Sequence, residues 1–137
     1  RWRNDPHTRA MSLNPYEVTE SEHALWLGAI LRDRTKRLML VYQGEYIGTY
    51  RLDGLGSVVE ISLTIAPEWR GRGLATPIIY EALRHAEREH AKEAVAVVRV
   101  ENVASQRAFA RAGFTVNIEI RGTRYYGRKI SVAAAPA

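Results

Sequence analysis

Residues 57–88 read SVVEISLTIAPEWRGRGLATPIIYEALRHAER, and this stretch decides the fold. Val59, Ile61 and Leu63 alternate with polar residues at a period of two. Such alternation predicts a strand with one buried face and one more polar face. A short turn rich in arginine and glycine follows, and an apolar run with helical spacing comes after it. The stretch therefore predicts a strand, a turn and a helix in direct succession.

The helical part of this stretch has apolar residues at intervals of three and four positions from Leu74 to Ala86. Charged residues lie between them, which is typical of an amphipathic helix packed on a core. Pro77 is compatible with a helix only in the first turn, where its missing N–H costs no hydrogen bond. We therefore expect the helix to begin near Gly73.

The turn before this helix has the chemistry of an anion site. The first amides of a helix lack intrahelical partners and lie at the positive end of its dipole. Gly71 and Gly73 remove side chains, so that a bulky anion can approach the backbone. Arg70 and Arg72 add donors suited to phosphate oxygens, and Thr76 adds a hydroxyl. The turn thus predicts a cradle for a phosphate or diphosphate.

The rest of the chain predicts a mixed α/β domain spanning residues 1–130, followed by a flexible tail at 131–137. A Thr-x-x-Glu capping box at Thr19 precedes the first helix. The expected elements, besides the strand and helix above, are a helix at 20–32, a hairpin of strands 37–42 and 46–52, a buried strand at 94–100, a helix from Asn102 to Ala112 and a closing hairpin of strands 114–120 and 124–130.

Composition restricts the possible functions. The 137 residues contain no cysteine, which excludes disulfides, thiolate metal sites and a covalent cysteine intermediate. The four histidines are scattered, so we expect no metal site. No apolar run approaches the roughly 18 residues of a membrane span, and the first residues contain no apolar secretory core. We therefore expect a cytoplasmic protein without a membrane partner.

The formal charge of +5 favours an anionic partner. Three phosphate-binding motifs compete for the glycine-arginine turn. A Walker loop requires a GK[ST] triplet, which the chain lacks. A dinucleotide fold is nearer, with Glu101 in the place of the ribose-binding acid, but Thr76 and the segment 66–70 interrupt its pattern. An RNA-binding arginine-glycine tract is the third, although a strand and a helix flank this turn closely.

The residues at 70–75, RGRGLA, resemble the coenzyme A signature [Q/R]-x-x-G-x-[G/A] of the GNAT acetyltransferases. Asn102, Ser105 and Phe109 follow at the family's spacing, ahead of a Gly-Phe pair. The resemblance covers residues 20–130. It implies the acyl-CoA N-acyltransferase fold, a central mixed and mostly antiparallel sheet flanked by helices. We expect the first strand of that fold to be absent from this sequence.

The resemblance also implies acetyl-CoA as the acetyl donor. Amides of the glycine-arginine turn would hold its diphosphate, and its pantetheine arm would follow the strand that ends at Ile65. Asn102 and Ser105 would contact it from the other side, although Asn102 is equally suited to cap a helix. The expected cofactor-binding residues are Ile65, Arg70, Gly71, Arg72, Gly73, Leu74, Ala75, Thr76, Asn102, Ser105 and Phe109.

Acetyl transfer to an amine needs a neutral amine, a thioester within reach and stabilisation of the oxyanion. Without cysteine, direct attack in a ternary complex is favoured over an acetyl-enzyme. Glu60 is the candidate base, and the alternative is an ordinary charge on an open strand face. Phe109 stands where many relatives carry a tyrosine that protonates the departing thiolate. Tyr125, Tyr126 or water would then take that role.

The amino-terminal segment is similar to the helices of GNAT enzymes that acetylate amino groups of nucleotide-linked sugars, or ribosomal-protein amino termini. We expect a small-molecule amine acceptor, with a nucleotide sugar preferred. A protein amino terminus, a non-catalytic acyl-CoA-binding module and, least favoured, a nucleic-acid binder remain alternatives, and a homodimer is left open. The acceptor-site candidates are Trp2, Arg3, Asn4, His23 and Trp26.

Overall fold

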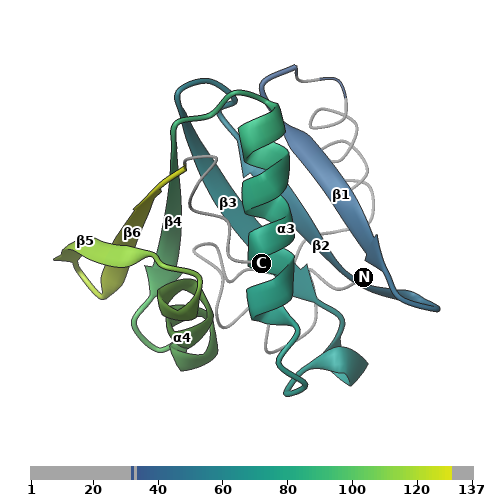
Figure 1. Cartoon of the computed structure of the whole chain (residues 1–137). Helices are drawn as coiled ribbons and strands as arrows, with labels where there is room; N and C mark the ends of the chain where they lie inside the picture. The colour runs from purple at the N-terminus through teal and green to yellow at the C-terminus, as the bar shows by residue number, and fades with distance from the viewer. Residues whose placement is uncertain (1–31, 33, 131–137) are drawn as a thin grey trace.

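A computed structural model describes Arg32 and residues 34–130, and in this part of the chain the strands form one mixed, mostly antiparallel sheet, as predicted (Figure 1). Its strand order is β1-β2-β3-β4-β6-β5, and β3 with β4 is the parallel pair. The predicted helix at 20–32, apart from Arg32, and the tail at 131–137 lie outside the described residues. The elements are β1 (Arg37–Tyr42), β2 (Tyr46–Asp53), β3 (Val58–Ile65), the short 3-10 helix η2 (Pro67–Trp69), α3 (Ala75–Arg88), β4 (Glu93–Arg99), α4 (Val103–Arg111), β5 (Thr115–Ile120) and β6 (Thr123–Lys129).

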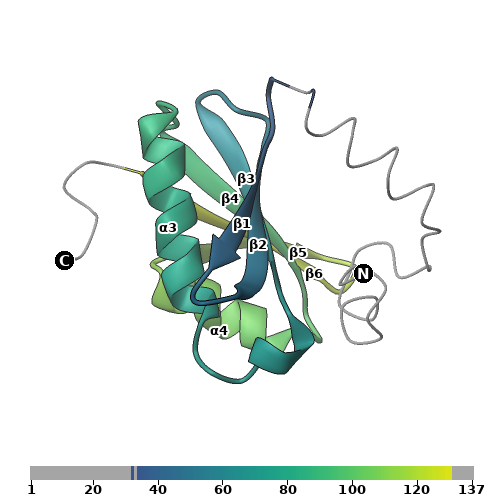
Figure 2. The ribbon, with the colours of Figure 1, turned by 90° about the vertical axis from the view of Figure 1, so that its right-hand side faces the viewer.

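Both described helices cover the same face of the sheet (Figure 2). In β3, Val59 and Ile61 are fully buried beneath α3, while Glu60 between them and Ser62 after them are only half-buried. This is the alternation that the sequence predicts. The buried positions of α3 include Ile79, so its apolar stripe packs on the apolar face of the sheet. Burial of these side chains supplies the main stabilisation of the fold.

The two parallel strands separate soon after they meet. Three consecutive residue pairs, from Val58 with Glu93 to Glu60 with Val95, form the ladder between β3 and β4. Beyond them β3 pairs only with β2, as far as Ile65. In Figure 1 the two strands part toward the end of the molecule where α3 begins. Within the described residues, the backbone N–H and C=O groups of residues 61–65 that point away from β2 therefore have no strand partner.

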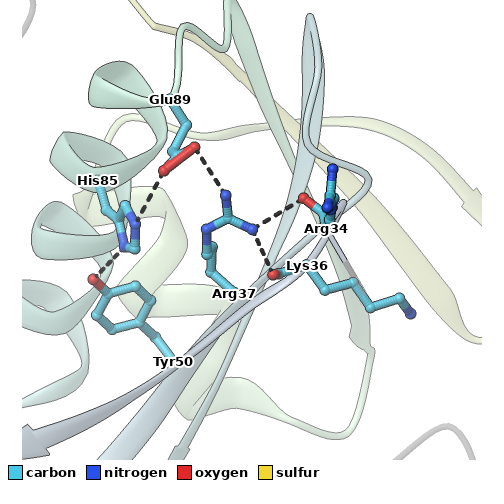
Figure 3. Close-up of polar contacts among 6 residues, drawn as sticks. All are labelled: Arg34, Lys36, Arg37, Tyr50, His85 and Glu89. Atoms are coloured by element: carbon cyan, nitrogen blue, oxygen red, sulfur yellow. Dashed lines mark hydrogen bonds and ion pairs between the residues drawn. The ribbon is translucent and has the colours of Figure 1, made fainter. Parts of the chain in front are cut away.

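The carboxyl-terminal half of α3 is fixed to β1 and β2 by polar side chains (Figure 3). The hydroxyl of Tyr50 lies 2.8 Å from Nδ1 of His85, and Glu89 lies 3.9 Å from Nε2 of the same ring. Arg37 reaches the other oxygen of Glu89 at 3.4 Å and donates to the carbonyls of Arg34 and Lys36. These contacts couple the helix to the edge of the sheet.

Burial is the largest cause that lowers the pKa of His85, and the positive charges of Arg88 and Arg37 lower it further. The carboxylates of Glu89 and Glu81 raise it, but they do not outweigh these effects. The folded chain therefore favours the neutral ring more than the unfolded chain does. As the pH falls, the unfolded chain takes up the proton first. The contribution of His85 to the free energy of unfolding is thus complete above about pH 6.5 and is lost as the pH falls toward the folded-state pKa.

We predict that His85→Asn flattens this part of the stability profile. The difference in unfolding free energy between wild type and variant, measured by urea denaturation, should shrink from pH 7.5 to pH 5. His90→Asn is the matched control, because His90 is exposed and its positive φ suits asparagine. Parallel profiles of wild type and His85→Asn would contradict the assignment.

Candidate functional site

The glycine-arginine turn is built as an open loop between η2 and α3. Gly71 and Gly73 have φ angles of 74° and 73°, a region that side chains disfavour. A Cβ atom built on either glycine would meet no atom within 4 Å. Glycine is therefore required here by the backbone conformation, and the space beside the loop is open to a ligand.

The amides of this loop point to a missing partner. Leu74 is the N-cap of α3, but its side chain cannot accept a hydrogen bond. Among the described residues, no acceptor is found for the amides from Gly71 to Thr76. Pro77, the third residue of α3, has no amide to satisfy. The loop and the helix start therefore present unpaired N–H groups at the positive end of the helix dipole, which is an anion-binding arrangement.

Trp69 positions the side chain of Arg72 in this loop. The guanidinium of Arg72 lies over the Trp69 ring, 4.6 Å from its centroid. The indole Nε1 donates to Oε1 of Glu45 at 2.6 Å, which joins η2 to the turn between β1 and β2. Neither Trp69 nor Glu45 is among the residues predicted for the site. An aromatic residue among arginines could have indicated the first, but only the fold brings Glu45 close.

Asn102 lies at the amino end of α4, directly after β4. Its Oδ1 accepts a hydrogen bond from the amide of Ser105 at 3.2 Å, so Asn102 acts as the helix cap that its residue type predicted. Since β3 and β4 are parallel, their carboxyl ends and the starts of α3 and α4 lie at one end of the sheet (Figure 1). The structure thus brings Asn102 and Ser105 to the same end of the sheet as the glycine-arginine turn.

Phe109 is part of the core, with 3 % of its surface exposed. Its ring packs edge-on against Phe114 at 5.0 Å and lies nearly parallel to Tyr126 at 6.3 Å. Tyr126 is equally buried, on the face that the helices cover. Tyr125 lies on the opposite face, where it is 39 % exposed. The two candidate acids therefore occupy different environments.

Glu60 lies where the strands part. It pairs with Val95 at the last position of the β3–β4 ladder, and on its other side it is opposite Asp53 of β2. It shares the face of Ser62 and Thr64, away from Val59. Burial raises the pKa of the Glu60 carboxyl and the Asp53 carboxylate raises it further, whereas Arg51 and Lys36 lower it. A carboxylate with raised basicity beside an opening in the sheet is suited to proton transfer.

The acceptor-site candidates Trp2, Arg3, Asn4, His23 and Trp26 lie outside the described residues. In the part of the chain that the structure covers, no three His, Cys, Asp or Glu side chains are grouped to hold a metal ion. None of the described helices is long and apolar enough to cross a membrane.

Comparison with known proteins agrees with this geometry. The family model described as an acetyltransferase (GNAT) domain matches residues 1–115. No curated protein matches the chain. Among solved structures, the spermidine N-acetyltransferase from Vibrio cholerae, in complex with CoA and spermine, superposes with a TM-score of 0.80 at 20 % identity, covering 94 % of this chain and 86 % of that one.

Two further structures have the same fold. The Campylobacter jejuni N-acetyltransferase PseH, in complex with acetyl coenzyme A, has a TM-score of 0.73 at 24 % identity over 81 % of this chain and 79 % of its own. A domain from Methanocaldococcus jannaschii has a TM-score of 0.80 at 18 % identity over 93 % and 87 %. The chain belongs to the GNAT acetyltransferase domain family. It is an acetyl-CoA-dependent N-acetyltransferase that acts on amines.

Proposed function

We propose that this enzyme moves the acetyl group of acetyl-CoA to the primary amine of an amino sugar nucleotide, by direct attack in a ternary complex. The observation that carries the donor site is the loop of unpaired amides at the end of the sheet where β3 and β4 part. Such amides bind phosphate oxygens with charge-assisted hydrogen bonds. The open space beside Gly71 and Gly73 fits the bulk of a diphosphate.

The donor would extend from this loop toward the point where the strands diverge. Amides from Gly71 to Thr76 and the Arg72 guanidinium hold the diphosphate, and the pantetheine arm follows the unpaired edge of β3 near Ile65. A backbone amide of that edge is directed at the carbonyl oxygen of the thioester. The bound donor supplies the acetyl thioester. Asn102 and Ser105, at the same end of the sheet, contact the donor from the side of α4.

In this proposal, both proton transfers take place on the face of the sheet that carries Glu60. Glu60 accepts the proton that the amine loses as its nitrogen attacks the acetyl carbon. The carbon–sulfur bond then breaks, and the thiolate takes a proton. Tyr125 is the better placed acid, because it is exposed on the same face as Glu60, whereas the ring of Tyr126 is buried against Phe109. Phe109 then supports the donor site through packing.

The acceptor is assigned from charge and from the acceptor-site candidates of the amino-terminal segment. The excess of five positive charges disfavours a polycation and favours an amine attached to phosphates. The aromatic candidates Trp2 and Trp26 are suited to stacking on a base. The solved relative in complex with spermine makes a polyamine the principal alternative acceptor.

Gly73→Leu tests the donor site. The new side chain would occupy the space of the diphosphate, so the affinity for acetyl-CoA, measured by calorimetry, should fall at least about tenfold, the loss of one charge-assisted hydrogen bond. Gly122→Leu is the matched control, since φ is 77° there, in the turn between β5 and β6. An affinity for acetyl-CoA that is unchanged in Gly73→Leu would overturn the placement of the diphosphate.

Glu60→Gln tests the base. Loss of general-base catalysis should lower kcat by about 100-fold or more, with little change in the KM for acetyl-CoA. In the wild type, the acid limb of the kcat/KM profile should lie above the ordinary carboxyl range, because the pKa of Glu60 is raised. In the variant that limb should disappear. If kcat in Glu60→Gln equals that of the wild type, Glu60 is not the base but an ordinary charge on an open strand face.

A panel of acceptors tests the substrate class. We expect kcat/KM for a nucleotide-linked 4-amino sugar to exceed that for spermidine, and for a peptide with a free amino terminus, by at least about tenfold. Release of the CoA thiol, followed with a chromogenic disulfide, measures all three reactions under the same conditions. A preference for spermidine or for the peptide would replace the nucleotide sugar as the assigned acceptor.

A further inference from the structure

The candidate base has a charged neighbourhood that the acetyl-transfer proposal does not use. In the register of β2 with β3, Asp53 is opposite Glu60 and Arg51 is opposite Ser62. Residues directly opposite each other in antiparallel strands share a face, with Cβ atoms about 4.5–5.5 Å apart. Diagonal neighbours such as Arg51 and Glu60 are about 7–8 Å apart, which is within reach of an arginine side chain. One arginine therefore stands beside two carboxylates.

Arg51 forms an ion pair with Asp53. The Nε and one terminal nitrogen of Arg51 lie 2.9 and 2.8 Å from the same oxygen, Oδ2 of Asp53. The other oxygen, Oδ1, is buried without a hydrogen-bond donor among the described residues, and the amino group of Lys36 lies 3.9 Å from it. Within the same residues, the Glu60 carboxylate forms neither a hydrogen bond nor an ion pair. Within the described residues, both neighbouring cations thus contact Asp53, and neither contacts Glu60.

This distribution of charge matters for proton transfer. A carboxylate held in an ion pair by arginine is a poor base, because the cation stabilises its charged form. Asp53 competes with Glu60 for Arg51, because both half-buried carboxylates lie within reach of its side chain. The charged groups around Glu60 are Asp53 and Arg51 from β2 and Lys36 from the segment before β1, while its partner on β4 is the apolar Val95.

We infer that Asp53 is a positioning residue of this active site, which holds Arg51 away from Glu60 and so keeps the base unpaired. The inference rests on the proposed role of Glu60. Asp53 itself does not reach the reacting atoms in this account. It acts through the placement of Arg51 and through its own negative charge. Both effects of Asp53 keep the pKa of Glu60 high. Burial and the Asp53 charge raise that pKa, and Arg51, which Asp53 holds away, lowers it.

Asp53→Asn is the first test, since it removes the charge and preserves the shape. The acid limb of the kcat/KM profile should move to lower pH by about one unit, as expected when an arginine pairs with a carboxylate. The plateau of kcat should fall severalfold, because the base is weaker. The KM for acetyl-CoA should not change, since the diphosphate loop lies at the other end of the donor site.

Arg51→Met is the second test and has the opposite sign. Asp53 then remains charged beside Glu60 without its counter-ion, and the acid limb should move to higher pH. In the double variant, Asp53→Asn with Arg51→Met, the limb should return most of the way toward its wild-type position. A purely structural role of the ion pair predicts no such reversal, since each loss would weaken the fold and the double variant would be the least active.

The outcomes separate the inference from the proposed function. If Glu60→Gln abolishes the acid limb while the limb of Asp53→Asn stays at the wild-type pH, Glu60 is the base and the positioning role of Asp53 is wrong. If Glu60→Gln retains the wild-type profile, the base assignment fails and the inference fails with it. Should Asp53→Asn not fold, as judged by its thermal unfolding, Asp53→Ser removes the same charge and takes its place in the test.

Discussion

The parting of β4 from β3 is the constraint on which the site depends. Two parallel strands of this length could form a ladder along their whole length, yet pairing ends at Glu60 and Val95. The backbone groups beyond that point give up sheet hydrogen bonds, and a buried edge in this state is costly unless another polar partner satisfies it. In the function proposed above, the extended pantetheine arm of the donor, which carries amides of its own, would supply such a partner. The fold thus leaves one side of β3 open at the end of the sheet where the donor is proposed to bind.

The helix α3 connects this opening to the rest of the molecule. Among the described residues no side chain caps its amino end, so its dipole and first amides are available to an anion. Its other end is held by the hydroxyl of Tyr50 and, through Glu89, by Arg37. A helix buried along one stripe and tied at its far end cannot easily shift along its axis. The geometry at its free end is therefore kept constant.

The two faces of the sheet carry different kinds of residue: one holds the apolar core, and the other holds the charged residues of the candidate site. On the helix-covered face Val59, Ile61 and their neighbours are buried, and Phe109 and Tyr126 complete the packing. On the opposite face Glu60, Asp53 and Arg51 stand together beside the divergence of the strands. Because side chains alternate strictly along β3, the residues that hold the core also orient the charged ones. A shift of one residue in the register would exchange the two sets.

The sequence by itself determined what depends on nearest neighbours. The alternation of Val59 and Ile61 predicted the strand and its buried face, the stripe from Leu74 predicted α3, and the glycine-arginine segment predicted the turn between them. The α3 helix begins at Ala75, two residues after the predicted start, because Leu74 serves as its N-cap. These features follow from local periodicity and backbone conformation, which act within a few residues.

Only the tertiary structure decided the contacts between distant residues. Glu45 bonds to Trp69 across 24 positions, and Asp53 meets Glu60 only because the turn between β2 and β3 sets their register. Tyr125 and Tyr126 are adjacent in sequence with no difference in type, and the pleat alone puts one in the core and the other on the open face. Periodicity states that two faces exist, whereas strand pairing and helix packing decide which side chains meet there.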